Sequence, residues 1–303
     1  MIETLTLAPG GESLLYLITV VVALMVGSFL NVVIVRVPQQ LQWQWHGRPE
    51  GLPKPTGIAG PVSRCPSCQQ PIRWRDNLPL VSFLILKGRC RSCNTTISGR
   101  YPLVEALCAG LSLVVVAVMG MQWSTLAALV FTWVLIALAF IDLEHFLLPD
   151  RLTLPLLAIG LGVNAANTFT DLISALVGAA AGYGVLWIVF HGFRILTGKE
   201  GMGQGDFKLL AALGAWLGWQ LLDLVILLSA GTGAIIGITM LILQRQQRGQ
   251  QIPFGPYLAG GGWLVLLWGE ELRQLLDILL DPSVTLLSKL WNSLVTLFSS
   301  VFV

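Results

Sequence analysis

Long apolar runs constrain this chain more than any other feature of its sequence. Eight of them, with soft ends, follow one another between residues 14 and 269. Hydrophobic residues make up 55% of the chain and charged residues only 11%, whereas a soluble domain carries about a quarter charged residues. A membrane-spanning helix needs about 20 apolar residues. The sequence therefore predicts an all-α polytopic membrane protein with about eight transmembrane helices.

The first and the shortest runs need separate comment. The first is too long for a signal-peptide core and is preceded by Glu3 and Glu12, so we expect no cleaved signal. The runs at 207–221 and 256–269 are short for a full crossing and could extend into flanking residues. The predicted spans are 14–35, 102–120, 123–141, 152–168, 173–193, 207–221, 224–243 and 256–269.

Basic residues separate the two sides of the membrane. Ten of the 18 Lys and Arg residues lie between the first two spans, and six more fall in later loops of the same side. Only Arg273 and Lys289 fall on the opposite side. Loops rich in Lys and Arg stay in the cytoplasm. We therefore expect a cytoplasmic first loop, and both termini outside.

The spans and loops divide the chain into four parts. Residues 1–36 comprise a tail and the first span, 37–101 the large cytoplasmic loop, and 102–269 the remaining spans. The loop is too small for a large apolar core and needs an additional cross-link, such as a bound metal or a disulfide, to fold stably. In the tail, 270–303, apolar residues recur at helical spacing, which predicts an amphipathic helix in the outer interface. A ninth span is the alternative.

Two Cys-x-x-Cys pairs form the most specific motif of the loop. Cys65 and Cys68 make the first pair, and Cys90 and Cys93 the second, with 69–89 between them. Pairs at about this separation are typical of a tetrahedral zinc site. Disulfides and idle thiols are the alternatives, although the cytoplasm keeps thiols reduced. Because four cysteines fill the coordination sphere, the predicted metal is structural rather than catalytic.

Two aspartates lie at the cytoplasmic ends of predicted spans. Asp142 follows an apolar run, and Asp206 follows three glycines within 201–205. A charged group in a membrane segment is by default a functional candidate. Two converging carboxylates can share one proton, as in aspartic proteases. From spacing alone, the alternatives are an ordinary boundary acid at Asp142 and a favourable helix-dipole contact at Asp206.

Residues near the two aspartates are weaker candidates. We expect Gly203, Gly205, Lys208 and Asp150 to support the same site. Asp150 could instead cap the following span, because aspartate is a preferred N-cap residue.

Taken together, the motifs resemble one family along about residues 27–260. They are similar to those of the bacterial type IV prepilin peptidases, which are bifunctional enzymes of the GxGD aspartic protease class. The matching segments are 27–33, 65–68, 77–82, 86–93, 97–105, 142–155, 201–210 and 253–257.

The resemblance implies that Asp142 and Asp206 are the catalytic pair. It implies cleavage of a basic leader from type IV prepilins and type II secretion pseudopilins, at the cytoplasmic face of the bacterial inner membrane. N-methylation of the new N-terminus with S-adenosylmethionine would follow. The tetracysteine loop is tied to methylation, and Gly88 and Glu105 fall in segments linked to it.

The expected cofactors are therefore structural zinc and S-adenosylmethionine. The expected partners are prepilins, pseudopilins and the lipid bilayer, with no nucleic acid, and the sequence carries no prediction of oligomeric state. Three acidic residues, Glu144, Asp150 and Glu200, are candidate contacts for the basic leader. The alternatives are a peptidase without methyltransferase activity and a zinc-stapled membrane scaffold or transporter.

Overall fold

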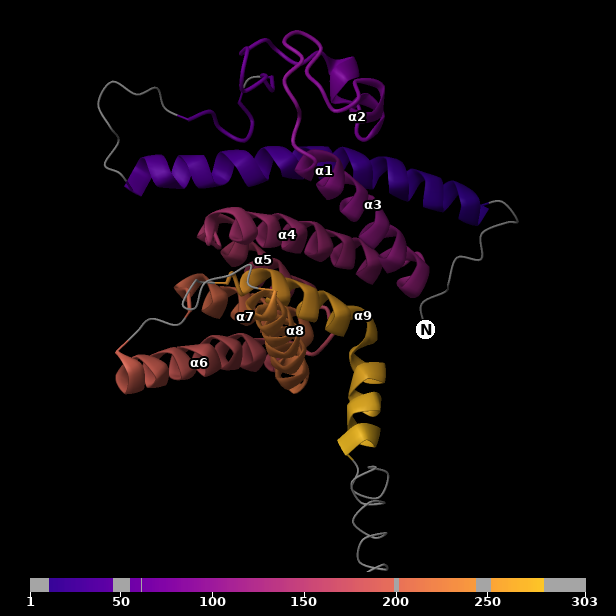
Figure 1. Cartoon of the computed structure of the whole chain (residues 1–303). Coiled ribbons are helices and arrows are strands. Elements are labelled where there is room, and N and C mark those ends of the chain that lie inside the picture. The colour runs from indigo at the N-terminus through magenta and orange to yellow at the C-terminus, as the bar shows by residue number, and fades with distance from the viewer. Residues whose placement is uncertain (1–10, 46–54, 61, 199–201, 244–251, 281–303) are drawn as a thin grey trace, which may run out of the picture.

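The computed structural model describes residues 11–45, 55–60, 62–198, 202–243 and 252–280. Within these ranges the regular elements are helices, and no strand is present. The eight longest helices follow the eight predicted apolar runs in the same order. Figure 1 shows α1 and α3 at one side of the bundle, α4 and α5 in the middle, and α6 to α9 at the other side.

Five segments are long and apolar enough to cross a membrane. Four of them lie in α1 (Gly11–Trp45), α3 (Arg100–Met119), α4 (Trp123–His145) and α6 (Leu172–Thr197). The fifth contains most of α8 (Leu222–Ile242). The prediction of a polytopic, all-helical membrane protein is therefore confirmed.

The other three predicted spans form shorter or more polar helices. They are α5 (Asp150–Asn164), α7 (Gln204–Leu217) and α9 (Gly255–Leu280). At about 1.5 Å per residue, α5 and α7 are about 22 and 21 Å long, less than the roughly 30 Å hydrocarbon core. The crossing of the membrane by these three helices stays a prediction.

Helix α7 forms the centre of the C-terminal half. It packs between α5, α6 and α9, and every one of its residues from Leu209 to Leu217 is buried. Small residues let membrane helices approach closely. A Cβ added to Gly214 would lie 2.1 Å from the carbonyl oxygen of Gly178 in α6. Only glycine at these positions therefore allows the observed contact between α6 and α7.

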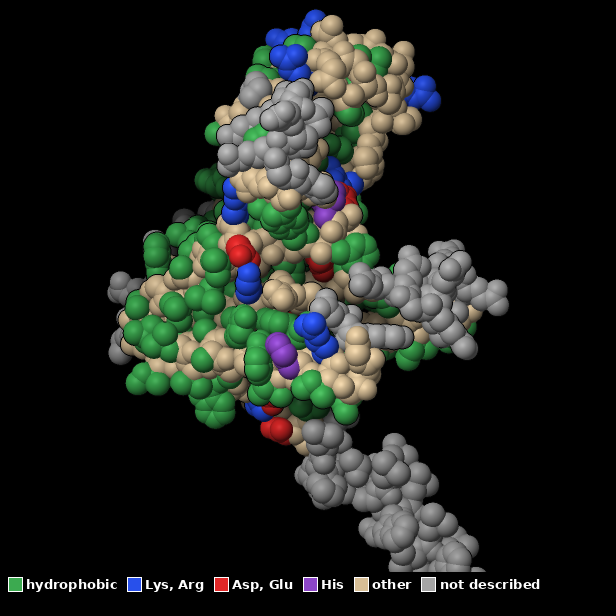
Figure 2. Space-filling model, turned by 90° about the vertical axis from the view of Figure 1, so that its left-hand side faces the viewer, with side chains coloured by type: hydrophobic (Ala, Val, Ile, Leu, Met, Phe, Trp, Pro, Cys, Tyr) green, Lys and Arg blue, Asp and Glu red, His purple; other side chains and the backbone are tan. Residues whose placement is uncertain are grey.

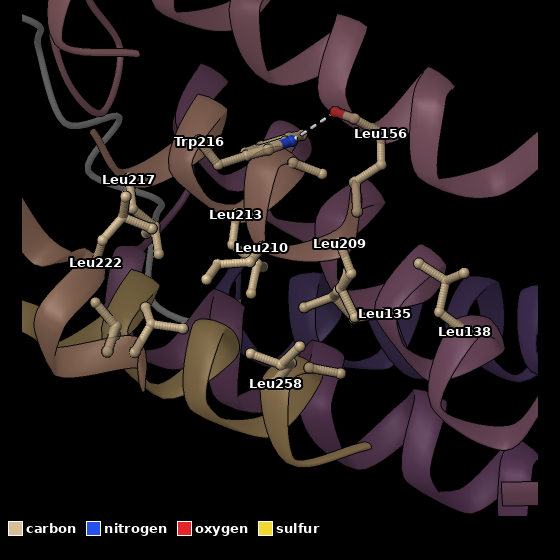
Figure 3. Close-up of a cluster of buried hydrophobic side chains, with 14 of the residues drawn as sticks. Leu135, Leu138, Leu156, Leu209, Leu210, Leu213, Trp216, Leu217, Leu222 and Leu258 are labelled. Atoms are coloured by element: carbon tan, nitrogen blue, oxygen red, sulfur yellow. Dashed lines mark hydrogen bonds between the residues drawn. The ribbon is translucent and has the colours of Figure 1, made fainter. Parts of the chain in front are cut away.

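A buried tryptophan ties α7 to its other neighbours. The Nε1–H of Trp216 donates to the carbonyl oxygen of Leu156 in α5 at 2.8 Å. Figure 3 shows this bond and the surrounding leucines, which come from α4, α5, α7, α8 and α9. Because a buried N–H without a partner is costly, the hydrogen bond also fixes the orientation of the indole. The position of α7 determines where its first turn, with Asp206, lies.

Helix α1 extends past the predicted end of its span. The span was expected to end at residue 35, and the helix ends at Trp45. In the added turns, Arg36 and Gln40 donate to the carbonyl oxygens of Gly57 and Thr56 at 2.8 and 2.9 Å. The polar extension of α1 therefore supports the start of the soluble loop.

The loop contains two short helices, η1 (Trp74–Asn77) and α2 (Val81–Ile85), and lies beside α1 in Figure 1. Its remaining described residues form turns and extended backbone. Arg91 in the loop forms a salt bridge of 2.7 Å with Asp76 in η1. This salt bridge holds the segment with Cys90 and Cys93 against η1, which follows Cys65 and Cys68 in the chain.

Helix α9 bends sharply at Trp268, whose backbone is not helical (φ −133°, ψ 26°). After the bend it runs away from the bundle, across the direction of α1 and α4 (Figure 1). Arg273 in this second half bonds to Asp223 and to the carbonyl oxygen of Gln220. The predicted amphipathic tail begins in this segment. The apolar positions on which that prediction rests lie beyond 280, outside the described residues.

Candidate active site and cysteine cluster

Asp142 lies in the last turn of α4 and is buried. The helix ends just after it, where Phe146 adopts a left-handed conformation (φ 52°) and its N–H donates to the carbonyl oxygen of Asp142 at 2.9 Å. The Oδ2 atom of Asp142 accepts a hydrogen bond of 2.9 Å from the backbone N–H of Gly255, the first residue of α9. The carboxyl group is therefore fixed by an element far along the chain.

Gly255 is a site residue that the sequence analysis did not identify. A Cβ at this position would lie 2.7 Å from Oδ2 of Asp142 and 3.1 Å from Cδ2 of Leu148. No side chain fits there without moving the carboxyl group or Leu148. The segment 253–257 was noted only as part of the family resemblance, because nothing in its composition indicates a contact with Asp142.

Asp206 lies in the first turn of α7 and is also buried. Its N–H donates to the carbonyl oxygen of Gly203 at 3.2 Å. The Oδ1 atom of its carboxyl group has no hydrogen-bond partner among the described residues. Such a buried, unpartnered polar atom requires an explanation, and a catalytic role is one of the few that apply.

The structure brings the two aspartates together. Leu148 lies against Gly205, the residue before Asp206, and against Gly255, whose N–H binds Asp142. A Cβ on Gly205 would lie 2.7 Å from Cβ of Leu148, so this glycine, like Gly255, makes room for the Leu148 side chain. The arrangement is a pair of buried acids at one end of the bundle, held by α4, α7 and α9.

Asp150 and Lys208, two predicted supporting residues, form an ion pair next to the aspartates. Lys208 Nζ lies 2.6 and 2.8 Å from the two carboxylate oxygens of Asp150. Asp150 is the first residue of α5, and Pro149 takes the N-cap position, so the alternative of an Asp150 N-cap is wrong. The pair joins α5 to α7. Gly203 lies at the start of α7, where an added Cβ would be 3.5 Å from Oδ2 of Asp206.

Glu144 is likewise paired, with Arg100 at 2.6 Å, which joins α4 to α3. Glu200 lies outside the described residues. Figure 2 shows the end of the molecule at which α1, α4 and α6 end: acidic, basic and histidine side chains follow a band down its middle, and hydrophobic side chains lie to the sides. Ion pairs therefore surround the end of the bundle that carries the two aspartates.

The four cysteines of the loop form one cluster. Their Sγ atoms all lie within 4.8 Å of one another, and those of Cys65 and Cys93 are 3.8 Å apart. A tetrahedral zinc site with Zn–S bonds of about 2.3 Å places its sulfurs about 3.8 Å apart, whereas a disulfide needs about 2.05 Å. The donor set and its spacing fit a tetrathiolate metal site.

The two cysteine pairs have the same backbone structure. In the first, the N–H of Cys65 donates to the carbonyl oxygen of Gln70, and the carbonyl oxygen of Cys65 accepts from the N–H of Gln69. In the second, the N–H of Cys90 donates to the carbonyl oxygen of Thr95, and the carbonyl oxygen of Cys90 accepts from the N–H of Asn94. Both Gln69 and Asn94 have φ of 57°. Each pair is thus a tight knuckle that presents two sulfurs in one direction, and the loop contains two copies of it.

The thiols of the cluster differ in pKa. Hydrogen bonds with the side chain and backbone of Thr95 lower the pKa of Cys93 to about 6. A hydrogen bond from the backbone of Gln70 lowers the pKa of Cys68, but burial and the neighbouring sulfurs outweigh it and raise the value to about 11. Four adjacent thiolates repel one another unless a cation neutralises them, which a thiophilic metal ion does.

Glu105 links the loop to the membrane helices. It is buried in α3, where Gly27 of α1 packs against its backbone. Its Oε2 accepts a hydrogen bond of 2.8 Å from the N–H of Leu80, at the start of α2. Leu80 itself has a φ of 57°, which is uncommon for a bulky residue. The contact holds the loop by its backbone, so Glu105 acts as an anchor for α2.

Gly88 also lies in the loop, at a φ of 66°, and a Cβ there would lie 3.0 Å from the ring of Phe83. Beside it is a hollow of about 370 Å³, lined by Leu86, Lys87, Arg89, Cys90, Arg91 and Asn94. The hollow shares Cys90 with the cysteine cluster. Any molecule bound in it would therefore lie next to the metal site.

Comparison with known proteins places the chain in one family. The bacterial peptidase A24 N-terminal domain matches residues 21–119, and the type IV leader peptidase family matches residues 129–238. The first match contains the tetracysteine loop and the second contains both aspartates.

Curated relatives match along most of their length. A prepilin leader peptidase/N-methyltransferase from Aeromonas hydrophila is 51% identical over 279 residues, which cover 89% of this chain and 96% of the relative. A protein of the same name from Pseudomonas aeruginosa is 49% identical over 266 residues, covering 85% and 92%. No solved structure gives a significant match. The chain therefore belongs to the type IV leader peptidase family and is an enzyme of the prepilin leader peptidase/N-methyltransferase class.

Proposed function

We propose that the chain removes the basic leader from type IV prepilins and type II secretion pseudopilins, and then methylates the new N-terminus. The observation that carries the peptidase half is the convergence of Asp142 and Asp206. Two buried acids from different helices, one with an unpartnered oxygen, lie at one end of the bundle. Burial of two interacting carboxyl groups without a function would be costly.

The pair acts on a water molecule. Two adjacent carboxyl groups share one proton. The ionised group takes a proton from water as its oxygen attacks the scissile carbonyl carbon, and the protonated group donates to the carbonyl oxygen. The tetrahedral intermediate then loses its C–N bond: the group that took the proton from water passes it to the leaving amine, and the other group recovers its proton as the carbonyl re-forms. The N–H of Gly255 keeps the Asp142 carboxyl group in position throughout.

Substrate geometry follows from the membrane. A prepilin presents a basic leader followed by a long apolar helix, which can lie in the bilayer and bring the peptide bond between them to the membrane boundary. The charge distribution of the loops supports a cytoplasmic position for that boundary, in the bacterial inner membrane. Glu144, Asp150 and Glu200 remain proposed contacts for the leader. Glu144 is paired with Arg100, and Asp150 with Lys208. A leader that binds either acid must therefore compete with its basic partner.

The methylation half uses the tetracysteine loop. We propose zinc as the metal held by Cys65, Cys68, Cys90 and Cys93, where its role is structural. S-adenosylmethionine supplies the methyl group when it is bound. A hollow of about 370 Å³ has the size of a small-molecule site, and Lys87 and Arg89 in its lining could pair with a carboxylate. Gly88 shapes this region, and Glu105 holds the loop against α1 and α3.

The test is cleavage of a purified prepilin in the presence of S-adenosylmethionine. The wild type should release the leader and add one methyl group to the mature pilin. Asp142→Asn and Asp206→Asn preserve the shape of each side chain and should each abolish leader release. If a folded variant still cleaves the prepilin, the aspartate that it lacks is not catalytic. Cleavage without methylation would favour a plain peptidase, and an inactive, folded wild type would favour a scaffold.

A further inference from the structure

A hollow lies between α8 and the start of α9. It measures about 270 Å³ and is lined by Ala230, Gly233, Ala234, Ile252, Pro253, Phe254 and Tyr257. None of these side chains is charged, and the only side-chain polar atom among them is the Tyr257 hydroxyl. The hollow therefore suits an apolar side chain and not the basic leader.

One wall of the hollow is continuous with the catalytic centre. Phe254 directly precedes Gly255, whose N–H binds Asp142, and Tyr257 follows two residues later. A group that fills the hollow therefore contacts the segment that positions the acid.

The opposite wall consists of small residues on α8, a helix that is less buried than the other candidate spans. Gly233 lies so close to Tyr257 that a Cβ would be 3.2 Å from its ring. The apolar window in α8 is 22% buried, less than those of the other four candidate spans, which are 28 to 56% buried. Ile235 and Ile238 are among its exposed side chains. Helix α8 thus presents an apolar face, beside the hollow, to which another helix can pack.

We propose that this hollow binds the apolar side chains that follow the scissile bond of the prepilin. The proposal rests on the proposed function and adds a specificity site to it. The basic part of the substrate then remains at the charged end of the bundle. The apolar part lies along α8, with one large side chain between Ala234 and Tyr257, and the peptide bond between the two parts lies near Asp142.

The test fills the hollow and asks which substrates are affected. Ala234→Phe is compared with Ile188→Phe, a change to the same residue at an exposed position of α6 outside the hollow, in the full-length enzyme in lipid nanodiscs. Two prepilins are used, the natural one and one in which the large apolar residues just after the cut are replaced by alanine. Ala230→Phe serves as a second filling variant if Ala234→Phe does not fold.

Ala234→Phe should raise KM for the natural prepilin by about tenfold or more, with little change in kcat, because a large side chain no longer fits. The increase should largely disappear with the alanine-substituted prepilin, and Ile188→Phe should resemble the wild type with both. Equal losses on both substrates, or equal behaviour of the two variants, would overturn the proposal and leave the hollow as a lipid-facing surface. If the wild type itself fails to cleave, the proposed function fails first.

Discussion

At the scale of single residues, the site depends on glycines as much as on acids. Gly205 and Gly255 each leave space for Leu148, and Gly255 also donates its N–H to Asp142. The acids were predictable from the sequence because charges are rare in apolar helices. The role of Gly255 was not, because its partner is 113 residues away and a glycine before a helix has many ordinary explanations.

Gly255→Ala should therefore reduce cleavage strongly. The added methyl would lie 2.7 Å from Oδ2 of Asp142, so the carboxyl group must move. Displacement of a catalytic group by about 1 Å costs roughly a hundredfold in rate. We expect a fall of about that size in kcat, with KM little changed, in a prepilin cleavage assay.

The matched control is Gly260→Ala, in the same helix, where nothing lies within 4 Å of the added Cβ. This variant should cleave like the wild type and be slightly more stable, since alanine favours helix over glycine by roughly 1 kcal/mol. Equal activity of both variants would show that the Gly255 contact is not needed for catalysis.

At the scale of elements, the loop and the helix bundle are joined by few contacts. Glu105 anchors α2 through Leu80, and the extension of α1 bonds to residues 56 and 57. The cysteine pairs were predictable because metal ligation needs a fixed spacing. The tight knuckle of each pair was predictable from the same motif, but the positive φ at Gln69 and Asn94 was not, since neither residue is a glycine.

Metal removal should separate the two activities. Without the cation the four sulfurs repel one another, and the loop loses the metal that cross-links it. Cys90→Ser, or treatment with a strong zinc chelator, should lower the zinc content and abolish most methylation while cleavage persists. Metal analysis by emission spectrometry and product masses measure both effects. Cys108→Ser, at the buried cysteine outside the cluster, is the control and should retain the metal.

Glu105 should act through its hydrogen bond and not through its charge. Glutamine at this position can still accept from the N–H of Leu80, whereas leucine cannot. A buried N–H left without its acceptor costs about 1–3 kcal/mol. We expect Glu105→Leu to reduce methylation by about tenfold or more at unchanged cleavage, and Glu105→Gln to retain most of it. If both variants lose methylation equally, the carboxylate itself is required, for instance by the methyl donor.

At the scale of the whole molecule, the order of the helices followed from the sequence, because each apolar run is long and is bounded by polar or turn residues. The arrangement of the helices did not. The central place of α7 depends on glycine contacts such as Gly178 with Gly214, and on the bond from Trp216 to Leu156. The bend at Trp268 lies next to Gly269, where the sequence analysis ended the last span and began the tail, but the new direction of the helix could not be predicted.

The central claim is that one chain carries two separate centres, an aspartate pair in the bundle and a metal-stapled loop for methylation. Mass spectrometry of a prepilin incubated with S-adenosylmethionine and either Asp206→Asn or Cys90→Ser tests it most directly. We expect uncut prepilin with Asp206→Asn, methylation of a pre-cut pilin by that same variant, and cut but unmethylated pilin with Cys90→Ser. Loss of both activities in each folded variant would contradict it and indicate a single shared centre.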